Sequence, residues 1–424
     1  MNTINIIISL IFIFGYLAIA LEYRIKINKT ALAILMAVFT WSLLFLKKDL
    51  IPDLSKTVLD GYIGNASQII FFLLSAMTLV ELIDSHGGFK IINKVIKSKS
   101  QKTLLWIVGL IAFFISSVLD NLTTTILMIS ILKKLVPDNK QRLVFGSIVV
   151  IAANAGGAWT PIGDVTTTML WIQGQLTSIN VMKALFLPSL FSLVVTILII
   201  SITIKGKIDT SNHKTEIKSE PGSRIVLILG LSALLFVPVF HYITGLPPFM
   251  GMFIGLGILW IITDLMHHKH ESRKHLRVPY VLTKIDTSGV LFFLAILLAI
   301  NSLEMVGILK SLAIWLDKHV GNLAVVATLL GFLSSIVDNV PLVAACIGMY
   351  NLSTFPTDSN LWHMIAYTAG TGGSILLIGS AAGVALMGLE KVDFIWYMKK
   401  ISLVAVAGYL AGMALYLLLN TLYV

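Results

Sequence analysis

The sequence predicts an all-α polytopic membrane protein with two inverted-topology repeats, each with a re-entrant hairpin and a glycine-broken transmembrane helix. Three observations support this fold class: the composition, a pair of matched interruptions in apolar stretches, and an uneven distribution of positive charge. Of 424 residues, 57% are hydrophobic and 12% are charged, and the mean hydropathy is +0.92. A soluble protein carries about 25% charged residues, and no soluble core of this length could bury so much apolar surface. The composition therefore excludes a soluble enzyme, a secreted disulfide scaffold and a disordered chain.

The formal net charge is +10, from 31 Lys and Arg against 21 Asp and Glu. In a soluble protein this excess would favour nucleic-acid binding, but basic residues of a membrane protein gather in cytoplasmic loops. We therefore expect no nucleic-acid partner. Cys346 is the only cysteine, which excludes an intrachain disulfide and a cysteine-based metal site. The histidine-rich run 267–270 is interpreted as a solvated loop rather than a metal site. We expect no cofactor and no partner protein of another kind. We expect membrane lipid around the chain.

Apolar runs long enough to cross about 30 Å of hydrocarbon define the expected crossings. The first run ends in Ala18-Ile19-Ala20, which fits a signal-peptidase site, but residues 1–5 carry no positive charge and Arg24 lies just beyond the run. This charge bias favours a retained transmembrane helix, with a cleaved signal as the open alternative. The predicted crossings are 4–22, 30–46, 66–84, 143–174, 181–204, 224–243, 247–265, 287–309, 361–389 and 401–423.

Two further apolar stretches, 103–136 and 321–352, are each interrupted at their middle by Asp-Asn, at 120–121 and at 338–339. Each arm is too short for a full crossing. Lysines flank the first stretch on both sides, which predicts a re-entrant hairpin that enters and leaves on the cytoplasmic side. The second stretch has no positive charge after it and is predicted to enter from outside.

The predicted topology has both termini outside, ten crossings and two hairpins, and charge counting supports it. Twenty-five of the 31 Lys and Arg residues fall on the cytoplasmic side. Residues 90–102 are interpreted as an amphipathic helix on the anionic inner leaflet. The cytoplasmic segments are 23–29, 90–102, 133–142, 205–224, 266–285 and 391–400.

An internal duplication relates the two interrupted regions. Ser-Ser-Val-Leu-Asp-Asn at 116–121 matches Ser-Ser-Ile-Val-Asp-Asn at 334–339, a separation of 218, and the glycine motif at 154–164 matches 370–380, a separation of 216. Because the two hairpins open to opposite sides, the repeats have opposite topology, which is the signature of secondary transporters. The predicted organisation is 1–60, N-terminal scaffold helices; 61–204, repeat one; 205–223, a cytoplasmic linker; 224–286, scaffold helices and a basic loop; and 287–424, repeat two.

The interruptions carry the chemistry. Asp120, Asp164 and Asp338 all fall at helix breaks, and a carboxylate inside a membrane is costly and usually functional. Oxygen ligands suit hard cations, and no Lys or Arg lies at a hairpin tip or glycine break, which favours a cation as the cargo. Further oxygens come from Ser116, Ser117, Asn121, Thr123, Thr124, Ser334, Ser335, Asn339 and Thr371. The expected backbone breaks are at Gly156, Gly157, Pro161, Gly163, Gly372, Gly373 and Gly379.

A carboxylate removed from water holds a proton more tightly, so a proton and Na⁺ compete for the same oxygens. Together with alternating access, this competition produces antiport. The alternative for each Asp-Asn is a plain helix cap or Asx-turn. For Glu81, Asp84 and Glu304 the alternative is an ordinary interfacial residue, and His86 is either a packing residue or a pH sensor.

The motifs at 116–125 and 154–171 closely resemble the NhaD-type sodium/proton antiporters, within a superfamily that also holds divalent anion/sodium symporters and arsenite permeases. The stretch 284–304 and the motif at 334–339 resemble that family too. The resemblance implies Na⁺(Li⁺)/H⁺ exchange across a bacterial inner membrane, with protons entering and sodium leaving, and a homodimer with scaffold and transport domains. It assigns ion and proton binding to Asp120, Asn121, Asn154, Asp164, Thr166, Thr167, Ser334, Asp338, Asn339, Ser374 and Ser380.

Sodium is expected at Asp120, Asn121, Asp338 and Asn339. Ser380 stands where repeat one has Asp164, so the two halves of the site are not equivalent. A sodium-coupled dicarboxylate carrier or an arsenite permease on the same scaffold stays the alternative, and a non-transport role in the membrane is the third.

Overall fold

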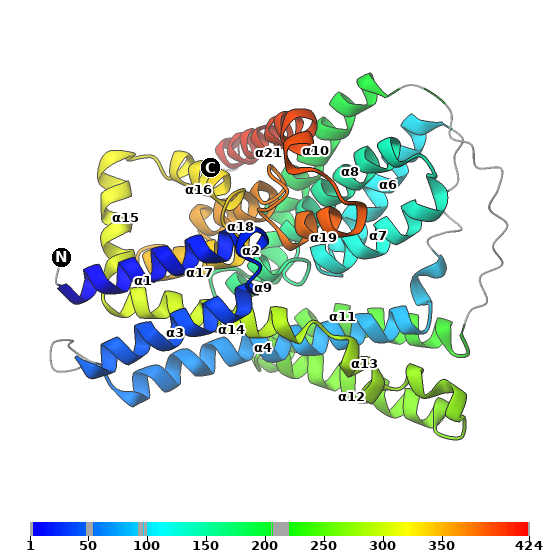
Figure 1. The fold of residues 1–424 in the computed structure, drawn as a ribbon, viewed down its shortest axis with the longest axis horizontal. Coiled ribbons are helices and arrows are strands. Elements are labelled where there is room, and N and C mark those ends of the chain that lie inside the picture. Colours follow the sequence, from blue (N-terminus) through cyan, green and yellow to red (C-terminus); the bar gives the residue numbers. More distant parts are fainter. Residues whose placement is uncertain are drawn as a thin grey trace.

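The computed structural model describes residues 3–47, 54–91, 96, 100–204, 206 and 220–422 (Figure 1). Every regular element in these ranges is a helix, and nine helical segments among them are long and apolar enough to cross a membrane. The chain is therefore a multi-pass, all-helical membrane protein. The nine segments are α1 (Thr3–Ala20), α3 (Lys29–Leu46), α4 (Lys56–Ser85), α8 (Asn139–Ala158), α10 (Ser178–Thr203), α11 (Ser223–Thr244), α12 (Pro248–His267), α14 (Thr287–Met305) and Phe394–Leu422, which joins α20 (Phe394–Tyr397), the π-helical η5 (Met398–Ser402) and α21 (Leu403–Leu422).

Helix breaks occur where the sequence predicts them. The stretch 103–136 forms two helices separated at residues 117–120, and 321–352 forms two separated at 335–338. The crossings predicted over 143–174 and 361–389 are likewise split, at 159–164 and 373–380. The resulting helices are α6 (Gln101–Ser116) and α7 (Asn121–Leu135), α16 (Leu323–Ser334) and α17 (Asn339–Met349), α8 followed by α9 (Val165–Ile172), and α18 (Asn360–Gly372) followed by α19 (Ala381–Glu390).

Two differences from the predicted elements have local causes. Helix α4 begins ten residues before the predicted 66, because Ser55 caps it by accepting a hydrogen bond from the Val58 N–H at 3.2 Å. Helix α15 (Ile308–His319) was not predicted. It buries one face through Leu309 and Ala313 and exposes the other, so a search for uniformly apolar runs does not detect it. The connecting turns are α2 (Glu22–Ile25), η2 (Gly88–Ile91), η3 (Glu271–Leu276), α13 (Val278–Val281) and η4 (Leu282–Lys284).

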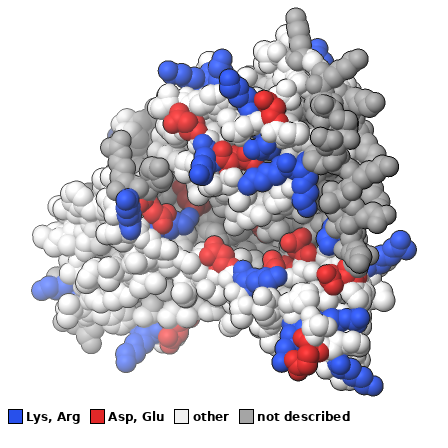
Figure 2. Space-filling model, turned by 45° about the vertical axis from the view of Figure 1, so that its right-hand side comes forward, with Lys and Arg blue, Asp and Glu red and all other residues white. Residues whose placement is uncertain are grey.

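The long helices α3, α4, α11, α12 and α14 form the lower layer in Figure 1, and the broken helices lie above them with α10 and α21. Helix α1 packs on α3 and α14, and α10 packs along α21. The end of the molecule drawn at the right of Figure 1 comes forward in Figure 2, where Lys and Arg side chains gather with acidic side chains between them. This is the end predicted to face the cytoplasm. Much of the predicted amphipathic helix at 90–102 and of the linker at 205–223 lies outside the described residues.

The broken helices of the two halves pack in a reciprocal way. The first arms α6 and α16 pack on α8 and α18 of their own half. The second arms α7 and α17 pack on the same two helices, and in addition on α19 and α9 of the other half. Matching hydroxyls join each hairpin tip to the long helix beside it: Ser116 donates to the Ala153 carbonyl at 2.6 Å, and Ser334 donates to the Ala369 carbonyl at 2.8 Å. Residues that are equivalent in the duplicated motifs thus make equivalent contacts.

Candidate ion-binding site

The two hairpin tips and the two helix breaks meet around Asp164. This side chain is 1% exposed. Its Oδ2 accepts one hydrogen bond from the Asn121 amide of the first hairpin at 3.3 Å and another from the Asn339 amide of the second at 3.2 Å. The Asn121 amide also donates to Asn154 Oδ1 at 2.8 Å, and the Asn154 amide donates to Ser380 Oγ at 3.0 Å. Five polar side chains from four broken segments therefore form one buried network.

Each polar residue at the start of a short helix also caps it. Asp120, Asp164 and Asp338 are the N-cap residues of α7, α9 and α17, and Ser380 caps α19. A helix N-terminus carries roughly half a positive charge, which stabilises an anionic side chain there. The Asp of each Asp-Asn motif can therefore both cap its helix and bind an ion, because a carboxylate that accepts from backbone N–H groups keeps further lone pairs free.

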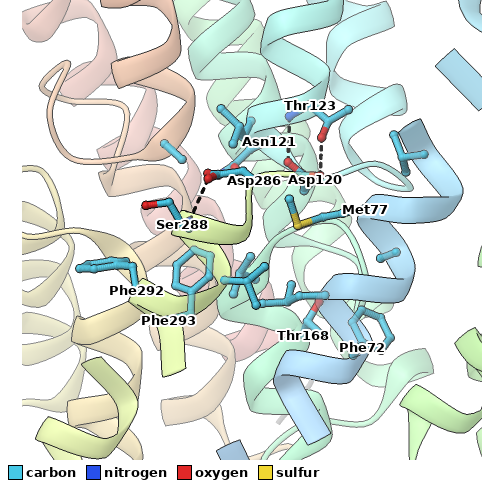
Figure 3. Close-up of a pocket in the computed structure, with 18 of the residues that line it drawn as sticks. Phe72, Met77, Asp120, Asn121, Thr123, Thr168, Asp286, Ser288, Phe292 and Phe293 are labelled. Atoms are coloured by element: carbon cyan, nitrogen blue, oxygen red, sulfur yellow. Dashed lines mark hydrogen bonds between the residues drawn. The ribbon is translucent and has the colours of Figure 1, made fainter. Parts of the chain in front are cut away.

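Asp120 and Asp338 line a cavity of about 340 Å³. Figure 3 shows Asp120, Asn121 and Thr123 on one side of this cavity and Asp286, Ser288 and the Phe292 and Phe293 rings of α14 on another. Thr123 donates to both oxygens of Asp120, through its N–H at 2.8 Å and its hydroxyl at 2.6 Å. Four polar residues that line the cavity lie at or next to the first residue of a helix, near the predicted cytoplasmic segments. They are Glu22, Asn28, Lys29 and Asp286.

A basic side chain that lies outside both motifs reaches the second hairpin tip. Lys29, the first residue of α3, places its ammonium nitrogen 3.6 Å from Asp338 Oδ2 and 4.4 Å from the centre of the Phe292 ring. The backbone N–H of Asp338 donates to the Tyr16 hydroxyl of α1 at 3.1 Å. The absence of Lys and Arg from the sequences of the hairpin tips and glycine breaks therefore does not keep a basic group away from the site. No local pattern could have shown this contact, since 309 positions separate the two residues.

The glycines act through close approach rather than through a change of backbone region. Helix α8 runs through Gly156 and Gly157 to Ala158, which corrects the expectation that the backbone leaves helical geometry there. A Cβ atom at Gly156 would lie 2.1 Å from the Phe113 carbonyl oxygen, and one at Gly372 would lie 2.2 Å from the Gly331 carbonyl oxygen. These glycines let the first arm of each hairpin touch the adjacent long helix, which sets the position of the tip.

Several predicted ligands use their hydroxyls elsewhere. Thr371 donates to the Tyr367 carbonyl at 2.5 Å and Ser374 to the Thr371 carbonyl at 2.6 Å, so both bond within their own segment. The Thr167 hydroxyl donates to the Ala158 carbonyl at 3.5 Å. The Thr166 N–H donates to Asp164 Oδ1 at 3.4 Å, but the Thr166 hydroxyl is buried without a hydrogen-bond partner among the described residues. Thr124 Oγ1 is likewise buried without a hydrogen-bond partner among the described residues, on the same face of α7 as Asn121.

Three other titratable residues lie apart from this network. Glu304 lines a separate cavity of about 100 Å³ together with Asn65, Asn301 and Gln173. His86, which is fully buried, contacts His267 through their Nε2 atoms at 3.1 Å, and its Nδ1 lies 2.8 Å from the Leu82 carbonyl oxygen. Burial lowers the pKa of His86 below its ordinary value. His267, expected in a solvated loop, is instead 1% exposed, because α12 extends to it and packs on α4.

Sequence comparison shows which known proteins this chain resembles. A family model described as a citrate transporter matches residues 10–363. Sodium/proton antiporter 1 of Arabidopsis thaliana is 50% identical over 424 residues, which cover 99% of this chain and 73% of that protein. Sodium/proton antiporter 2 of the same plant is 48% identical over 415 residues, with 96% and 98% covered. The Na(+)/H(+) antiporter NhaD of Vibrio cholerae is 30% identical over 449 residues, with 99% and 92% covered.

These identities extend over nearly the whole chain and include both hairpins and both breaks. They confirm the resemblance drawn from the motifs at 116–125 and 154–171. The chain belongs to the NhaD-type sodium/proton antiporter family, within the wider group described by the citrate-transporter model.

Proposed function

We propose that this protein is a secondary transporter that exports Na⁺ or Li⁺ in exchange for protons, with the ion and the proton competing for Asp120, Asp164 and Asp338. The observation that supports this most directly is the convergence of the two hairpin tips on Asp164 through Asn121 and Asn339. Because this one buried carboxylate contacts both halves of the molecule, binding of an ion or a proton there can change the contacts of both halves.

The charge of the site favours a cation. Four helix N-termini meet here, and uncapped N-termini would favour an anion. Three of them are instead capped by the chain's own carboxylates, and the fourth by Ser380. The citrate-transporter description of the matching family model makes an anion carrier the second candidate. An anion would have to approach three carboxylates with only Lys29 as a nearby balancing cation among the described residues, which argues against that candidate.

Exchange follows from competition at oxygen ligands. A protonated carboxylic acid cannot bind Na⁺ well, because the proton removes the negative charge and occupies one lone pair. Around Asp164 the amide oxygens of Asn121, Asn154 and Asn339 and the hydroxyl of Thr124 are candidate further ligands. Binding of Na⁺ would then release a proton, and binding of a proton would release Na⁺.

Alternating access is attributed to the two repeats, which we propose have inverted topology with re-entrant hairpins 103–136 and 321–352. The reciprocal packing of α7 on α19 and of α17 on α9 supports this arrangement. Part of the lining of the cavity beside Asp120 and Asp338, including Asn28 and Lys29, is predicted to lie at the cytoplasmic side, which favours access from the cytoplasm in this conformation. The proposed transport domain contains both hairpins and breaks, and the proposed scaffold contains the helices of 1–60 and 224–286, which are α1, α3, α11 and α12.

Two further features of the proposal rest on the family resemblance. The protein is proposed to form a homodimer, and to reside in a membrane that carries a proton gradient, such as a bacterial inner membrane. Relatives are found in both a plant and bacteria, so the membrane is identified by localising a tagged chain. Crosslinking of the protein in native membranes tests the dimer.

The function is tested in everted vesicles from a host that lacks its own sodium exchangers. Respiration acidifies the vesicles, and a pH-sensitive dye reports proton release on addition of Na⁺, Li⁺, K⁺ or citrate. Wild type is compared with Asp120→Asn, Asp164→Asn and Asp338→Asn. Asp393→Asn is the matched control, because Asp393 also caps a helix, by accepting from the Trp396 N–H at 2.8 Å, but lies outside the site. Na⁺-induced proton release that survives only in wild type and the control supports the proposal. Wild-type vesicles that respond to no cation from about pH 7 to 9.5 would refute it.

A further inference from the structure

We propose that Lys29 is a tethered cation that occupies Asp338 when Na⁺ is absent and must be displaced before Na⁺ binds there. Lys29 would then set the apparent Na⁺ affinity of the site without itself being transported. This inference rests on the proposed antiport function and identifies what competes with Na⁺, besides the proton, at the second hairpin.

The position of the ammonium group is defined by the local structure around it. Asn28 caps α3 by accepting from the Thr30 N–H at 2.8 Å, and Glu22 Oε1 accepts from the Lys29 N–H at 2.9 Å. The backbone at Lys29 is therefore fixed on both sides of the turn. From there its side chain extends over the face of the Phe292 ring and places Nζ 3.6 Å from Asp338 Oδ2. A cation above an aromatic face is attracted by the ring, which favours this rotamer.

Asp338 differs from Asp120 in a way that makes it the exchangeable partner. Asp120 accepts two hydrogen bonds from Thr123, at 2.8 and 2.6 Å. Asp338 accepts only a long one within its helix, from the Val340 N–H at 3.4 Å. Its side chain is 18% exposed and that of Lys29 is 33% exposed, and both line the cavity. The carboxylate therefore keeps coordination capacity for an entering ion, and the ammonium has solvent-accessible space into which it can move.

An ammonium group and Na⁺ are both monovalent cations that bind carboxylate oxygens, so one displaces the other at Asp338. The displaced ammonium has alternative acceptors, since Glu22 and Asp286 line the same cavity. The competing interpretation is a structural ion pair that merely holds α3 against the hairpin tip. The two interpretations differ in sign: removal of a competitor tightens Na⁺ binding, whereas removal of a structural contact leaves binding unchanged or weakens it.

The test uses the full-length protein in proteoliposomes, with Lys29→Met, Lys29→Gln and Lys29→Arg. Lys284→Met is the matched control, because Lys284 forms a comparable ion pair with Glu81 at 3.3 Å outside the cavity. We measure the KM and maximal rate for Na⁺-driven proton movement, and equilibrium binding of ²²Na⁺ to the same purified proteins.

We expect both uncharged variants to lower the Na⁺ KM and the ²²Na⁺ dissociation constant by about two- to fivefold, the upper range for a partly exposed ion pair. The Arg variant and the Lys284 control should stay within about twofold of wild type. If Met and Gln both leave these constants unchanged or raise them while wild type transports Na⁺, the inference is overturned and the proposed function stands. A wild-type protein that neither binds ²²Na⁺ nor moves protons overturns both.

Discussion

Asn121 and Asn339, one from each hairpin tip, donate to the same oxygen of Asp164 at 3.3 and 3.2 Å. Both hairpin tips therefore contact a single carboxylate, which belongs to repeat one, so its protonation or ion binding affects both. Its counterpart in repeat two is Ser380, which is linked to the same network through Asn154. The centre of the molecule is therefore symmetric in its backbone and asymmetric in its charge.

This shared acceptor predicts similar losses from Asn121→Ala and Asn339→Ala. A hydrogen bond to a charged group contributes about 1.5–3 kcal/mol, so each variant should lower the maximal rate of Na⁺-dependent proton release by roughly 10- to 100-fold. Ser130→Ala, which removes only a bond to the Ile126 carbonyl in its own helix, is the control. Loss of activity in one Asn variant alone would show that a single hairpin controls Asp164.

The close contact at Gly156 predicts opposite effects for two helical glycines. Gly156→Ala would put a Cβ 2.1 Å from the Phe113 carbonyl oxygen and should destabilise the protein by about 1–3 kcal/mol. Gly388→Ala, in the exposed part of α19 with nothing within 4 Å, should stabilise it by up to about 1 kcal/mol. Melting temperatures in detergent measure both. Equal effects would mean that close packing does not explain Gly156.

The buried Glu390 predicts an asymmetric response to loss of its ion pair. Its side chain is 2% exposed and accepts from Arg142 Nε at 2.8 Å, with Lys133 4.0 Å away. Arg142→Met leaves a buried carboxylate and should cost about 3–5 kcal/mol, whereas Glu390→Gln removes the charge and should cost less. Chemical denaturation of the two variants in mixed micelles orders them. A larger loss for Glu390→Gln would contradict this account.

The contact between His86 and His267 predicts a loss of stability in acid. Because burial lowers the pKa of His86, the folded state takes up its proton at a lower pH than the unfolded chain, which does so near pH 6.5. The unfolded state therefore binds more protons between those two values, and stability falls as the pH drops below about 6.5. Glu220 and His275 are the nearby charged and titratable groups, with opposite effects on His86.

Thermal melting from pH 8 to pH 5.5 tests this relation. Wild type should lose stability across that interval, with at most about 1.4 kcal/mol from His86, because the interval extends only about one pH unit below the unfolded pKa. His86→Leu should reduce the dependence on pH. His319→Leu, at an exposed position stacked on Trp315, should leave it as in wild type. A pH dependence identical in wild type and His86→Leu would assign the effect to other groups.

The sequence predicted the parts of this structure that depend on local pattern. Apolar run length located nine helical segments that are long and apolar enough to cross a membrane, whereas the predicted crossing 361–389 is two short helices. Asp-Asn located the starts of α7 and α17, because a carboxylate before a helix caps it wherever the chain goes next. The duplicated spacing predicted that two tips and two breaks belong together. The grouping of Asp164 with Asn121 and Asn339 follows that spacing.

Contacts between distant segments were not predictable in this way. The approach of Lys29 to Asp338 depends on how α3 is placed beside a hairpin over 300 residues later, and no periodicity records it. The meeting of His86 with His267 has the same origin. The bonds of Thr371 and Ser374 were not predictable for a different reason, because a hydroxyl can donate to the backbone of its own segment, and composition does not reveal this bond. Their role as ligands stays a prediction.

The reciprocal packing of the short helices has a consequence for how the chain matures during synthesis. Helix α9 leaves the ribosome well before α17, the helix of the second half on which it packs, and α7 must wait for α19, which is completed only at Glu390. Neither half can therefore reach its native arrangement as an independent folding unit. The first half is inserted with surfaces that only the second half can cover, so the ion-binding centre cannot be completed before the second half has been synthesised. A nascent chain that stops before Ala381 should be a substrate for membrane quality control.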